Sequence, residues 1–308
     1  MTDLLLSPAT RIAPGRGRPD DDEGHPGAVI RLLASCPDRP GIVHAVTRFL
    51  FGQGANIIRS DQHASGDGDP MLFLRLEFCL PEGTSPGDFL HDFSTCVAHR
   101  FDMTWRMVEA EKVKRCAVLV SRADHCLVDL LWRFKRQRLG ADISLVASNH
   151  PDLRELTESF GIPFHHVPID KDNPDEGHGR LARLVRGNCD FVVLARYMQI
   201  LPAAFLGEVA VPLINIHHSF LPAFAGGSPY DQAKRRGVKL IGATAHYVTA
   251  ELDAGPIIEQ DVVRVSHRDD VSSLRCMGAD VERAVLARAV RWHSEDRLLQ
   301  HGNSVVVF

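Results

Sequence analysis

The hydrophobic positions between residues 29 and 110 predict six elements in the order β-α-β-β-α-β. The first is a strand, AVIRLLA, followed by a helix, IVHAVTRFLFGQG, that ends at Gly54. Two strands joined by the turn GDGDP come next, NIIRSDQHAS and MLFLRLEFCL; a helix near 85–100 and a strand near 101–108 complete the set. This order is typical of a ferredoxin-like domain.

After a charged segment at 111–115, which we interpret as a linker, the pattern changes. Continuous apolar strands now alternate with helices, which predicts a mostly parallel, Rossmann-like sheet covered on both faces, over residues 116–308. The predicted strands are CAVLVS, ADISLVAS, FHHVPI, FVVLARY, PLINIHHS and TAHYVT, and the clearest helices are 125–139, 151–160 and 271–300.

Composition narrows the class of protein without naming a function. The 308 residues are 44% hydrophobic and carry a formal net charge of −4, which argues against a nucleic-acid or membrane-surface partner. Residues 1–28 show no hydrophobic period, and we expect a disordered tail there. Seven cysteines without a CxxC pair favour reduced thiols and a cytoplasmic location. The histidines form no HExxH pair, so we expect no metal site.

Candidate chemistry gathers between residues 211 and 260. Asn215 and His217 stand two residues apart at the end of a predicted strand, so their side chains should share a face. His246 lies on a later strand, and Asp253 lies in a turn before Gly255. An amide, an imidazole and a carboxylate that meet there would suit acyl transfer. Spacing alone leaves other readings open: a hydrogen-bonded polar pair, a core histidine and a turn-forming aspartate.

Longer motifs resolve these alternatives by resemblance. The runs concerned are NIHHSFLP at 215–222, His246, LDAGPII at 252–258, LARYMQIL at 194–201, HCL at 125–127 and ARAVRWH at 287–293. Together they closely resemble the folate-dependent formyltransferase fold and, within it, the formyltetrahydrofolate deformylase family. Asp38-Arg39-Pro40-Gly41-Ile42-Val43 resembles the opening of an ACT domain, a ferredoxin-like regulatory module that this family carries at its N-terminus, here over residues 29–110.

The resemblance implies hydrolysis of 10-formyltetrahydrofolate to formate and tetrahydrofolate, which adjusts the one-carbon folate pool and supplies formate for purine synthesis. It implies no cofactor and no metal. Asn215, His217 and Asp253 would be the catalytic trio, and the pterin would lie along Tyr197, Met198, Gln199, Ile200 and Leu201, with His246 also in the substrate site. The ACT unit would assemble into a homo-oligomer and bind an amino acid, glycine or methionine, near Asp38, Gly41 and Asn56.

Two other functions remain to be weighed. A formyltransferase acting on glycinamide ribonucleotide normally needs a Gly-rich phosphate loop after the first strand. That loop here, Ser121-Arg122-Ala123-Asp124-His125, has no glycine and contains an acid, which favours water as the acceptor. A non-catalytic amino-acid sensor should have lost one of the trio, and all three residues are present.

Overall fold

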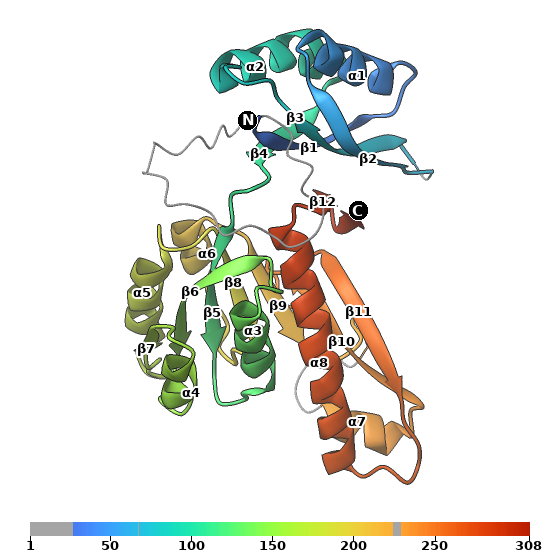
Figure 1. The fold of residues 1–308 in the computed structure, drawn as a ribbon. Helices are drawn as coiled ribbons and strands as arrows, with labels where there is room; N and C mark the ends of the chain where they lie inside the picture. The colour runs from blue at the N-terminus through green and yellow to red at the C-terminus, as the bar shows by residue number, and fades with distance from the viewer. Residues whose placement is uncertain (1–26, 67, 224–228) are drawn as a thin grey trace. The chain divides into compact units, whose positions relative to one another are not determined.

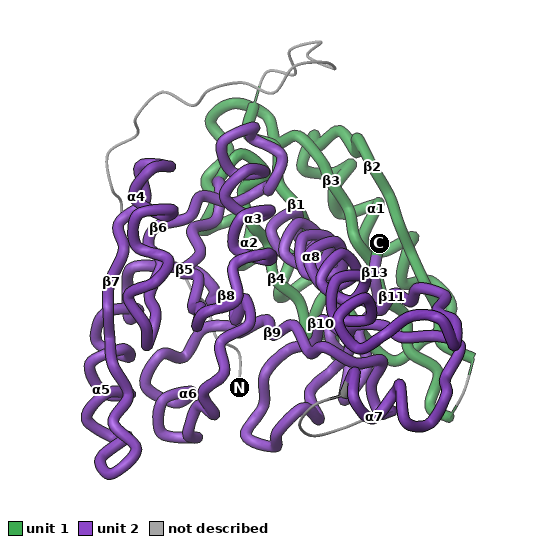
Figure 2. Tube along the Cα trace, turned by 90° about the horizontal axis from the view of Figure 1, so that it is seen from below, with its two compact units in different colours: residues 1–112, 308 green, residues 113–307 purple. Residues whose placement is uncertain are grey.

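The computed structural model describes residues 27–66, 68–223 and 229–308. Most of the expected tail, residues 1–26, lies outside the described residues, as does position 67 of the predicted turn GDGDP. Internal contacts divide the chain into two units, residues 1–112 with 308, and residues 113–307 (Figure 2). Each unit is treated separately below.

The first unit is a four-stranded antiparallel sheet with two helices, in the sheet order β2-β3-β1-β4 (Figure 1). Its elements are β1 (Val29–Pro37), α1 (Ile42–Gly52), β2 (Asn56–Ala64), β3 (Met71–Cys79), α2 (Pro86–Phe93) and β4 (Thr104–Glu109). A π turn (Ser94–Ala98) and a 3-10 turn (His99–Phe101) extend α2. The predicted ferredoxin-like order is confirmed. The last strand begins later than predicted, because Phe101 still belongs to the helical segment and packs into the core.

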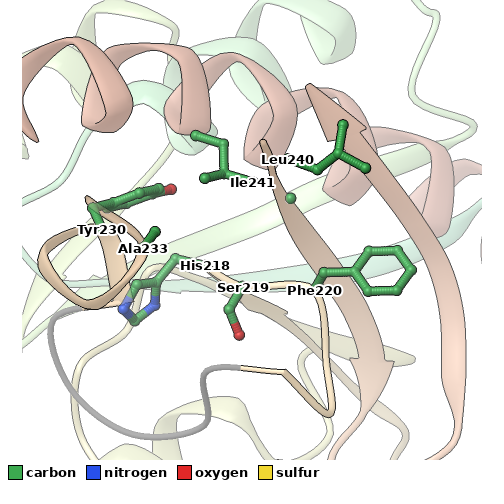
Figure 3. A pocket seen from close by; sticks show the side chains of 8 residues that line it. His218, Ser219, Phe220, Tyr230, Ala233, Leu240 and Ile241 are labelled. Carbon is green, nitrogen blue, oxygen red and sulfur yellow. The ribbon is translucent and has the colours of Figure 1, made fainter. Parts of the chain in front are cut away.

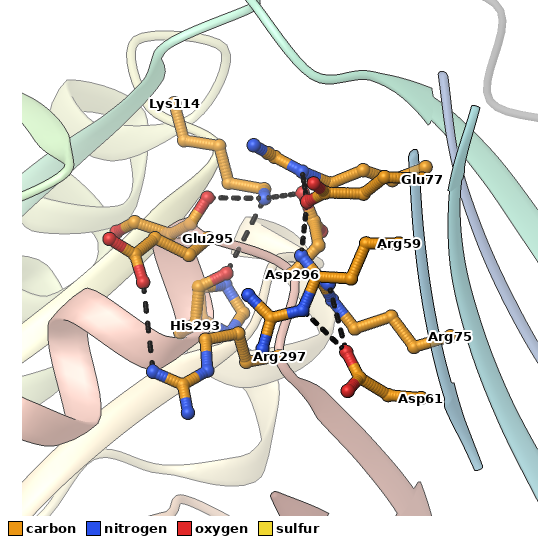
Figure 4. A network of polar contacts seen from close by, with 11 residues as sticks. Arg59, Asp61, Arg75, Glu77, Lys114, His293, Glu295, Asp296 and Arg297 are labelled. Atoms are coloured by element: carbon orange, nitrogen blue, oxygen red, sulfur yellow. Dashed lines mark hydrogen bonds and ion pairs between the residues drawn. The ribbon is translucent and has the colours of Figure 1, made fainter. Parts of the chain in front are cut away.

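Alternation along the strands explains the two faces of this sheet. Leu32, Ala34 and Cys36 of β1 pack with residues of α1 and α2 in one apolar cluster. Some positions of opposite parity carry charge. Arg31 Nε lies 2.8 Å from Glu77 Oε1. Arg75 lies next to the same carboxylate (Figure 4). Ion pairs therefore cross this face from β1 to β3.

The second unit is a seven-stranded mixed sheet in the order β11-β10-β9-β8-β5-β6-β7. The parallel strands are β5 (Lys114–Val120), β6 (Ala141–Ser148), β7 (Phe164–His166), β8 (Phe191–Ala195) and β9 (Leu213–His217). Two antiparallel strands, β10 (Leu240–Tyr247) and β11 (Ile257–Arg264), extend one edge. β5 starts inside the segment interpreted as a linker, because Lys114 already pairs with Ala141 of β6.

Helices cover both faces of this sheet (Figure 1). Cys116, Val118 and Val120 of β5 pack in one cluster with α3 (His125–Lys135) and α8 (Val271–Ser294). Ala117 and Leu119 pack on the other face with α5 (Pro174–Val185) and α6 (Ala203–Val209). The short helices α4 (Arg154–Ser159) and α7 (Pro229–Arg236) complete the unit. The predicted two-sided, mostly parallel sheet is confirmed.

The C-terminal helix is shorter than the predicted 271–300. α8 ends at Ser294, and Asp296 then takes a left-handed φ of 52° that turns the chain away from the helix. Lys114 Nζ lies 2.6 Å from Asp296 Oδ2 at this turn (Figure 4). The chain then forms a hairpin of β12 (Leu298–His301) and β13 (Ser304–Val307).

The direction of chain travel reverses between β5 and β8. From β5 the chain moves through β6 to β7, and it then returns to the other side of β5 as β8 and continues to β9. Open α/β sheets bind ligands at such a switch point, beyond the carboxyl ends of the strands. The loops that begin at Ser121 and at Arg196 leave the sheet at this point.

The cysteines divide by exposure. All seven lie within the described residues and are free thiols; Cys96 and Cys276 are exposed, and the other five are buried. Burial raises the pKa of the thiols of Cys36, Cys79, Cys116, Cys126 and Cys189. Across the described residues, the structure contains no helix with the length and apolar character needed to cross a membrane.

Candidate active site

Strand pairing brings the first two candidate residues together. β9 and β10 run antiparallel, and Asn215 is directly opposite His246. The Nδ1 atom of His246 lies 2.9 Å from the carbonyl oxygen of Tyr247. Because a carbonyl only accepts, Nδ1 is the protonated nitrogen, and Nε2 accepts a hydrogen bond from Asn215 Nδ2 at 3.2 Å. Asn215 keeps its second N–H for another acceptor.

Asp253 reaches the same place from a tight turn. The turn joins β10 to β11, and the Tyr247 N–H donates to the Pro256 carbonyl across it at 2.9 Å. Gly255 is required there, because a Cβ would lie 1.8 Å from the Tyr247 carbonyl oxygen. Asp253 itself has a φ of 54°, a left-handed conformation that aspartate tolerates better than most residues. The sequence LDAGP thus folds into a turn that directs a carboxylate toward the sheet.

Asp253 lies beside both histidines. Its Oδ2 is 3.3 Å from His217 Nδ1, and its Oδ1 is 3.7 Å from His246 Nε2. The contact with His217 holds the pKa of the Asp253 carboxyl well below its usual range, although burial opposes it. Asp253 is therefore a carboxylate at any ordinary pH.

The geometry leaves one ring nitrogen of His217 for a reactant. With Nδ1 directed at Asp253, the other nitrogen, Nε2, is buried and has no hydrogen-bond partner among the described residues. Buried polar atoms are rarely left unpaired, and such an atom in a site is a place for a ligand. His217 is only 6% exposed, so the site confines whatever meets this nitrogen.

His218 turns to the other side of the strand end. Its ring centroid lies 5.0 Å from that of His217 and 6.2 Å from that of Tyr230. Burial first, then the charges of Arg196 and His217, lowers the pKa of His218 to about 4, so the ring is neutral. Behind it lies a cavity of about 20 Å³, with His218 and Tyr230 on one side (Figure 3). That volume suits one water molecule and not a folate.

The expected pterin segment follows β8 directly. Tyr197 is buried, and burial raises the pKa of its hydroxyl. The Met198 N–H donates to Ser121 Oγ at 3.0 Å, which ties the segment to the loop after β5. Met198 and Ile200 are 59% and 69% exposed. The segment thus presents apolar side chains at the edge of the sheet where ligands bind. Gln199 and Leu201 lie beside them on the same stretch.

A buried ionic network next to the trio was not anticipated from the sequence. Glu282 of α8, 2% exposed, accepts from Tyr230 Oη at 2.6 Å and pairs with His125 Nε2 at 2.8 Å. Arg196 Nε lies 3.3 Å from the same carboxylate. A signal was present: Glu282 continues the buried stripe of Leu274 and Gly278 along α8, where an apolar residue is expected.

The same network contains three side chains of the types that bind metal ions. Ligand atoms of His125, Cys126 and Glu282 lie within 4.8 Å of one another. Arg196, however, already supplies a positive charge to that carboxylate, and burial raises the pKa of the Cys126 thiol. This donor set fits an internal ion pair better than a metal, since a thiol ligand must be deprotonated.

The three expected effector residues do not meet within one chain. Asp38 and Gly41 follow the end of β1, which pairs with Met71, whereas Asn56 begins β2 opposite Cys79. The eight steps of β3 between these positions span ~26 Å at ~3.3 Å per residue. Within one chain these residues lie at opposite ends of the sheet, because α1 carries the backbone from the end of β1 back to the start of β2. The effector site near Asp38, Gly41 and Asn56 stays a prediction.

Comparison with known proteins places this geometry in a family. The Formyl transferase family model matches residues 114–290, and the ACT domain model matches residues 30–83. Formyltetrahydrofolate deformylases from Mycobacterium tuberculosis and Bacillus subtilis are 54% and 50% identical over 279 residues, covering 90% of this chain and 90% and 93% of theirs. The chain belongs to the formyltetrahydrofolate deformylase family. The family and the fold expected from the motifs are thereby confirmed.

Solved structures agree with that placement. A formyltetrahydrofolate deformylase from Pseudomonas syringae pv. tomato has a TM-score of 0.87 and 47% identity, covering 93% of this chain and 96% of its own. A phosphoribosylglycinamide formyltransferase from Anaplasma phagocytophilum has a TM-score of 0.57 and 33% identity, covering 64% of this chain and 95% of its own. The deformylase family therefore shares the fold of its second unit with phosphoribosylglycinamide formyltransferases.

Proposed function

We propose that the protein hydrolyses 10-formyltetrahydrofolate to formate and tetrahydrofolate. The observation that carries the proposal is the buried, unpartnered Nε2 of His217, with its other nitrogen held by Asp253 and the amide of Asn215 beside it. Membership of the deformylase family supports the same reaction. The site supplies donors where an oxyanion would develop and a carboxylate that orients the imidazole.

In the proposed reaction, water attacks the formyl carbon and the carbonyl oxygen becomes an oxyanion. Asn215 Nδ2 and protonated His217 Nε2 donate to that oxygen. The bond between the carbon and N10 then breaks, N10 takes the proton that the attacking water gives up, and formic acid leaves and ionises to formate. Asp253 is a weak proton acceptor because its pKa is lowered, so we assign it to ordering the water and to stabilising the cationic form of His217. The reaction so written requires no metal and no cofactor.

We assign substrate binding to the segment from Tyr197 to Leu201, with His246 holding Asn215. The exposed Met198 and Ile200 are joined by Leu252, which is 65% exposed and directly precedes Asp253. Apolar side chains at the entrance suit the aromatic rings of a folate. We further propose a cytoplasmic location, which the five buried free thiols favour, and a role in the folate pool that feeds purine synthesis.

Incubation with 10-formyltetrahydrofolate alone tests the proposal. We expect formate and tetrahydrofolate in equal amounts without any amine acceptor. Glycinamide ribonucleotide should neither accelerate the loss of the formyl group nor become formylated. Formylated ribonucleotide at a rate comparable to formate release would overturn the assignment in favour of a transferase.

The ACT unit supports a further proposal, that of a homo-oligomer regulated by glycine or methionine. Two copies packed side by side would bring Asp38 and Gly41 of one chain to Asn56 of the other, which a single chain does not do. Light scattering that shows a monomer at micromolar concentration would contradict the assembly. Activity that is unchanged across a panel of amino acids would contradict the regulation.

A further inference from the structure

The switch point of the second sheet is closed by the protein itself. The loop after β5 and the segment after β8 are joined at the hydrogen bond from Met198 to Ser121, whose hydroxyl also donates to Asn149 Oδ1 at 2.7 Å. Glu282 makes a second connection, to His125 after β5 and to Arg196 after β8. Side chains of the chain therefore lie where a sheet of this type has room for a ligand.

Glu282 stands at the centre of this closure. Its carboxylate has contacts with three partners from three different segments, the hydroxyl of Tyr230, the ring of His125 and the guanidinium of Arg196. Burial would raise the pKa of Glu282, but these partners outweigh it and lower the pKa, so the carboxylate is charged. The pairing with Arg196 compensates that buried charge.

The network is built against local preferences. Arg196 has a φ of 63°, which disfavours any residue with a Cβ, and its side chain is mostly buried. Gly278 is needed to admit Tyr230, because a Cβ there would lie 2.0 Å from the Tyr230 hydroxyl oxygen. Strained backbone and buried charge both cost stability, and such costs gather at functional sites.

The network also adjoins the reacting groups. His218 lies between His217 and Tyr230, with ring centroids 5.0 Å and 6.2 Å away. Arg196 and Glu282 both act electrostatically on His218. A molecule that approached the formyl carbon from the switch point would meet these charged side chains first.

We propose that Arg196, Glu282 and His125 take the place of an amine acceptor, and that this internal network is what makes water the acceptor. The inference rests on the proposed deformylase activity. If the network is removed, a primary amine should compete with water: its nitrogen attacks the formyl carbon, the bond to N10 breaks, the amine loses a proton and N10 gains one. The product is then an N-formyl amine instead of formate.

The test uses the full-length variant Arg196→Gly/Glu282→Ala. Both charges are removed together, so no uncompensated charge is left buried, and glycine adopts the φ at position 196 without strain. The enzyme is incubated with 10-formyltetrahydrofolate and excess glycinamide, and N-formylglycinamide and formate are measured by NMR. We expect the ratio of amide to formate to rise about tenfold or more, the range in which pocket contacts discriminate between substrates.

A matched control is Lys114→Ala/Asp296→Gly. It removes another ion pair of the same unit. Asp296, like Arg196, has a left-handed φ, so glycine replaces a residue of the same backbone conformation in both variants. This control should keep the wild-type ratio. If Arg196→Gly/Glu282→Ala does not fold, Arg196→Gly/Glu282→Gln replaces it, because glutamine still accepts the Tyr230 hydroxyl.

The outcomes separate the two proposals. The role of the network is overturned if the wild type releases formate and a folded network variant, Arg196→Gly/Glu282→Ala or Arg196→Gly/Glu282→Gln, has the wild-type ratio of amide to formate. A control that raises the ratio as much as the network variant overturns it too. A wild type that releases no formate without an amine overturns the deformylase assignment instead.

Discussion

Asp253 lies beside two histidines, and from this position we predict how the loss of its charge would affect catalysis. In Asp253→Asn the side chain keeps its size, and asparagine tolerates the left-handed φ. The amide would no longer stabilise a cationic His217. We expect kcat to fall by at least ~10²-fold, the scale of one positioned catalytic group, with little change in KM for the folate. Steady-state kinetics of formate release give both constants.

Two results would contradict this role. Turnover above about a tenth of wild type falls outside the range expected for such a group. A large increase in KM with kcat intact would make Asp253 a binding residue. Thermal melting of the variant provides the control for folding.

His218 predicts a pH dependence of stability. In the unfolded chain the ring takes up a proton near pH 6.5, whereas in the fold it does so only at about pH 4. Between these values the unfolded state binds more protons, so the free energy of unfolding falls as pH is lowered, by up to ~1.4 kcal/mol per pH unit. His218→Gln removes this dependence.

Urea unfolding at about pH 7 and about pH 5 measures the effect. We expect wild type to lose ~1–2 kcal/mol more than His218→Gln over that interval. Buried His178, whose pKa burial also lowers, contributes to both proteins alike. Equal losses in the two proteins would show that His218 does not titrate as described.

Among single residues, the sequence predicted those site residues that lie close together along the chain or belong to a strong motif. Asn215 and His217 share a strand, and the LDAGP turn returns Asp253 to it. Glu282, Tyr230 and Arg196 were missed because each comes from a different element, and their pairing is set by tertiary packing. The acid within the apolar stripe of α8 was the available clue.

Among the elements, helix α8 contributes Glu282 to the network. Its Gly278 leaves room for the side chain of Tyr230. In Gly278→Ala the new methyl group would collide with the Tyr230 hydroxyl. The methyl group cannot move away, because it is attached directly to the helix backbone. We expect a loss of ~1–3 kcal/mol, as in other overpacked cores. Urea unfolding measures it.

Gly207→Ala in α6 is the matched control. A Cβ at position 207 would meet no described atom within 4 Å apart from its chain neighbours and its own helix backbone, so the better helix former should stabilise by up to ~1 kcal/mol. The opposite signs of the two substitutions test the packing argument. A Gly278→Ala protein as stable as wild type would contradict the packing of Tyr230 against α8.

Elements with a strong period were predictable, and those at the edges were not. β5, β6, β8 and β9 are buried on both faces and are rich in apolar residues. β11 was missed because its sequence, IIEQDVVR, mixes charge with apolar residues on an exposed edge strand. The predicted helix ran to residue 300, into the first strand of the hairpin, and the second strand was not predicted. The turn at Asp296 depends on a left-handed φ that the residue type alone does not indicate.

For the whole molecule, the ~26 Å between the two ends of the first sheet predicts shared effector sites, since that span far exceeds an amino acid. Asp38→Ala and Asn56→Ala should each abolish the response to the effector. Mixed oligomers of the two variants contain sites with both native residues. We therefore expect the response to return in part when the two proteins are unfolded and refolded together.

Each variant refolded alone is the control and should stay insensitive. Activity at rising glycine or methionine concentration is the measurement. A mixture that stays insensitive, or an Asn56→Ala protein with a full response, would contradict a site shared between chains. The order of strands followed from sequence rules, whereas the distance between these residues required the register of β1, β2 and β3.

The exposure of the cysteines has a practical consequence for spectroscopy. Cys96 lies in the first unit and Cys276 in the second, and these two are the exposed thiols among the seven. The buried five, with raised pKa, react slowly with maleimides. Labelling of the unmodified chain should therefore place one fluorophore on each unit. Energy transfer between the dyes would then report, in a single molecule, whether an added amino acid changes the distance between the two labelled thiols.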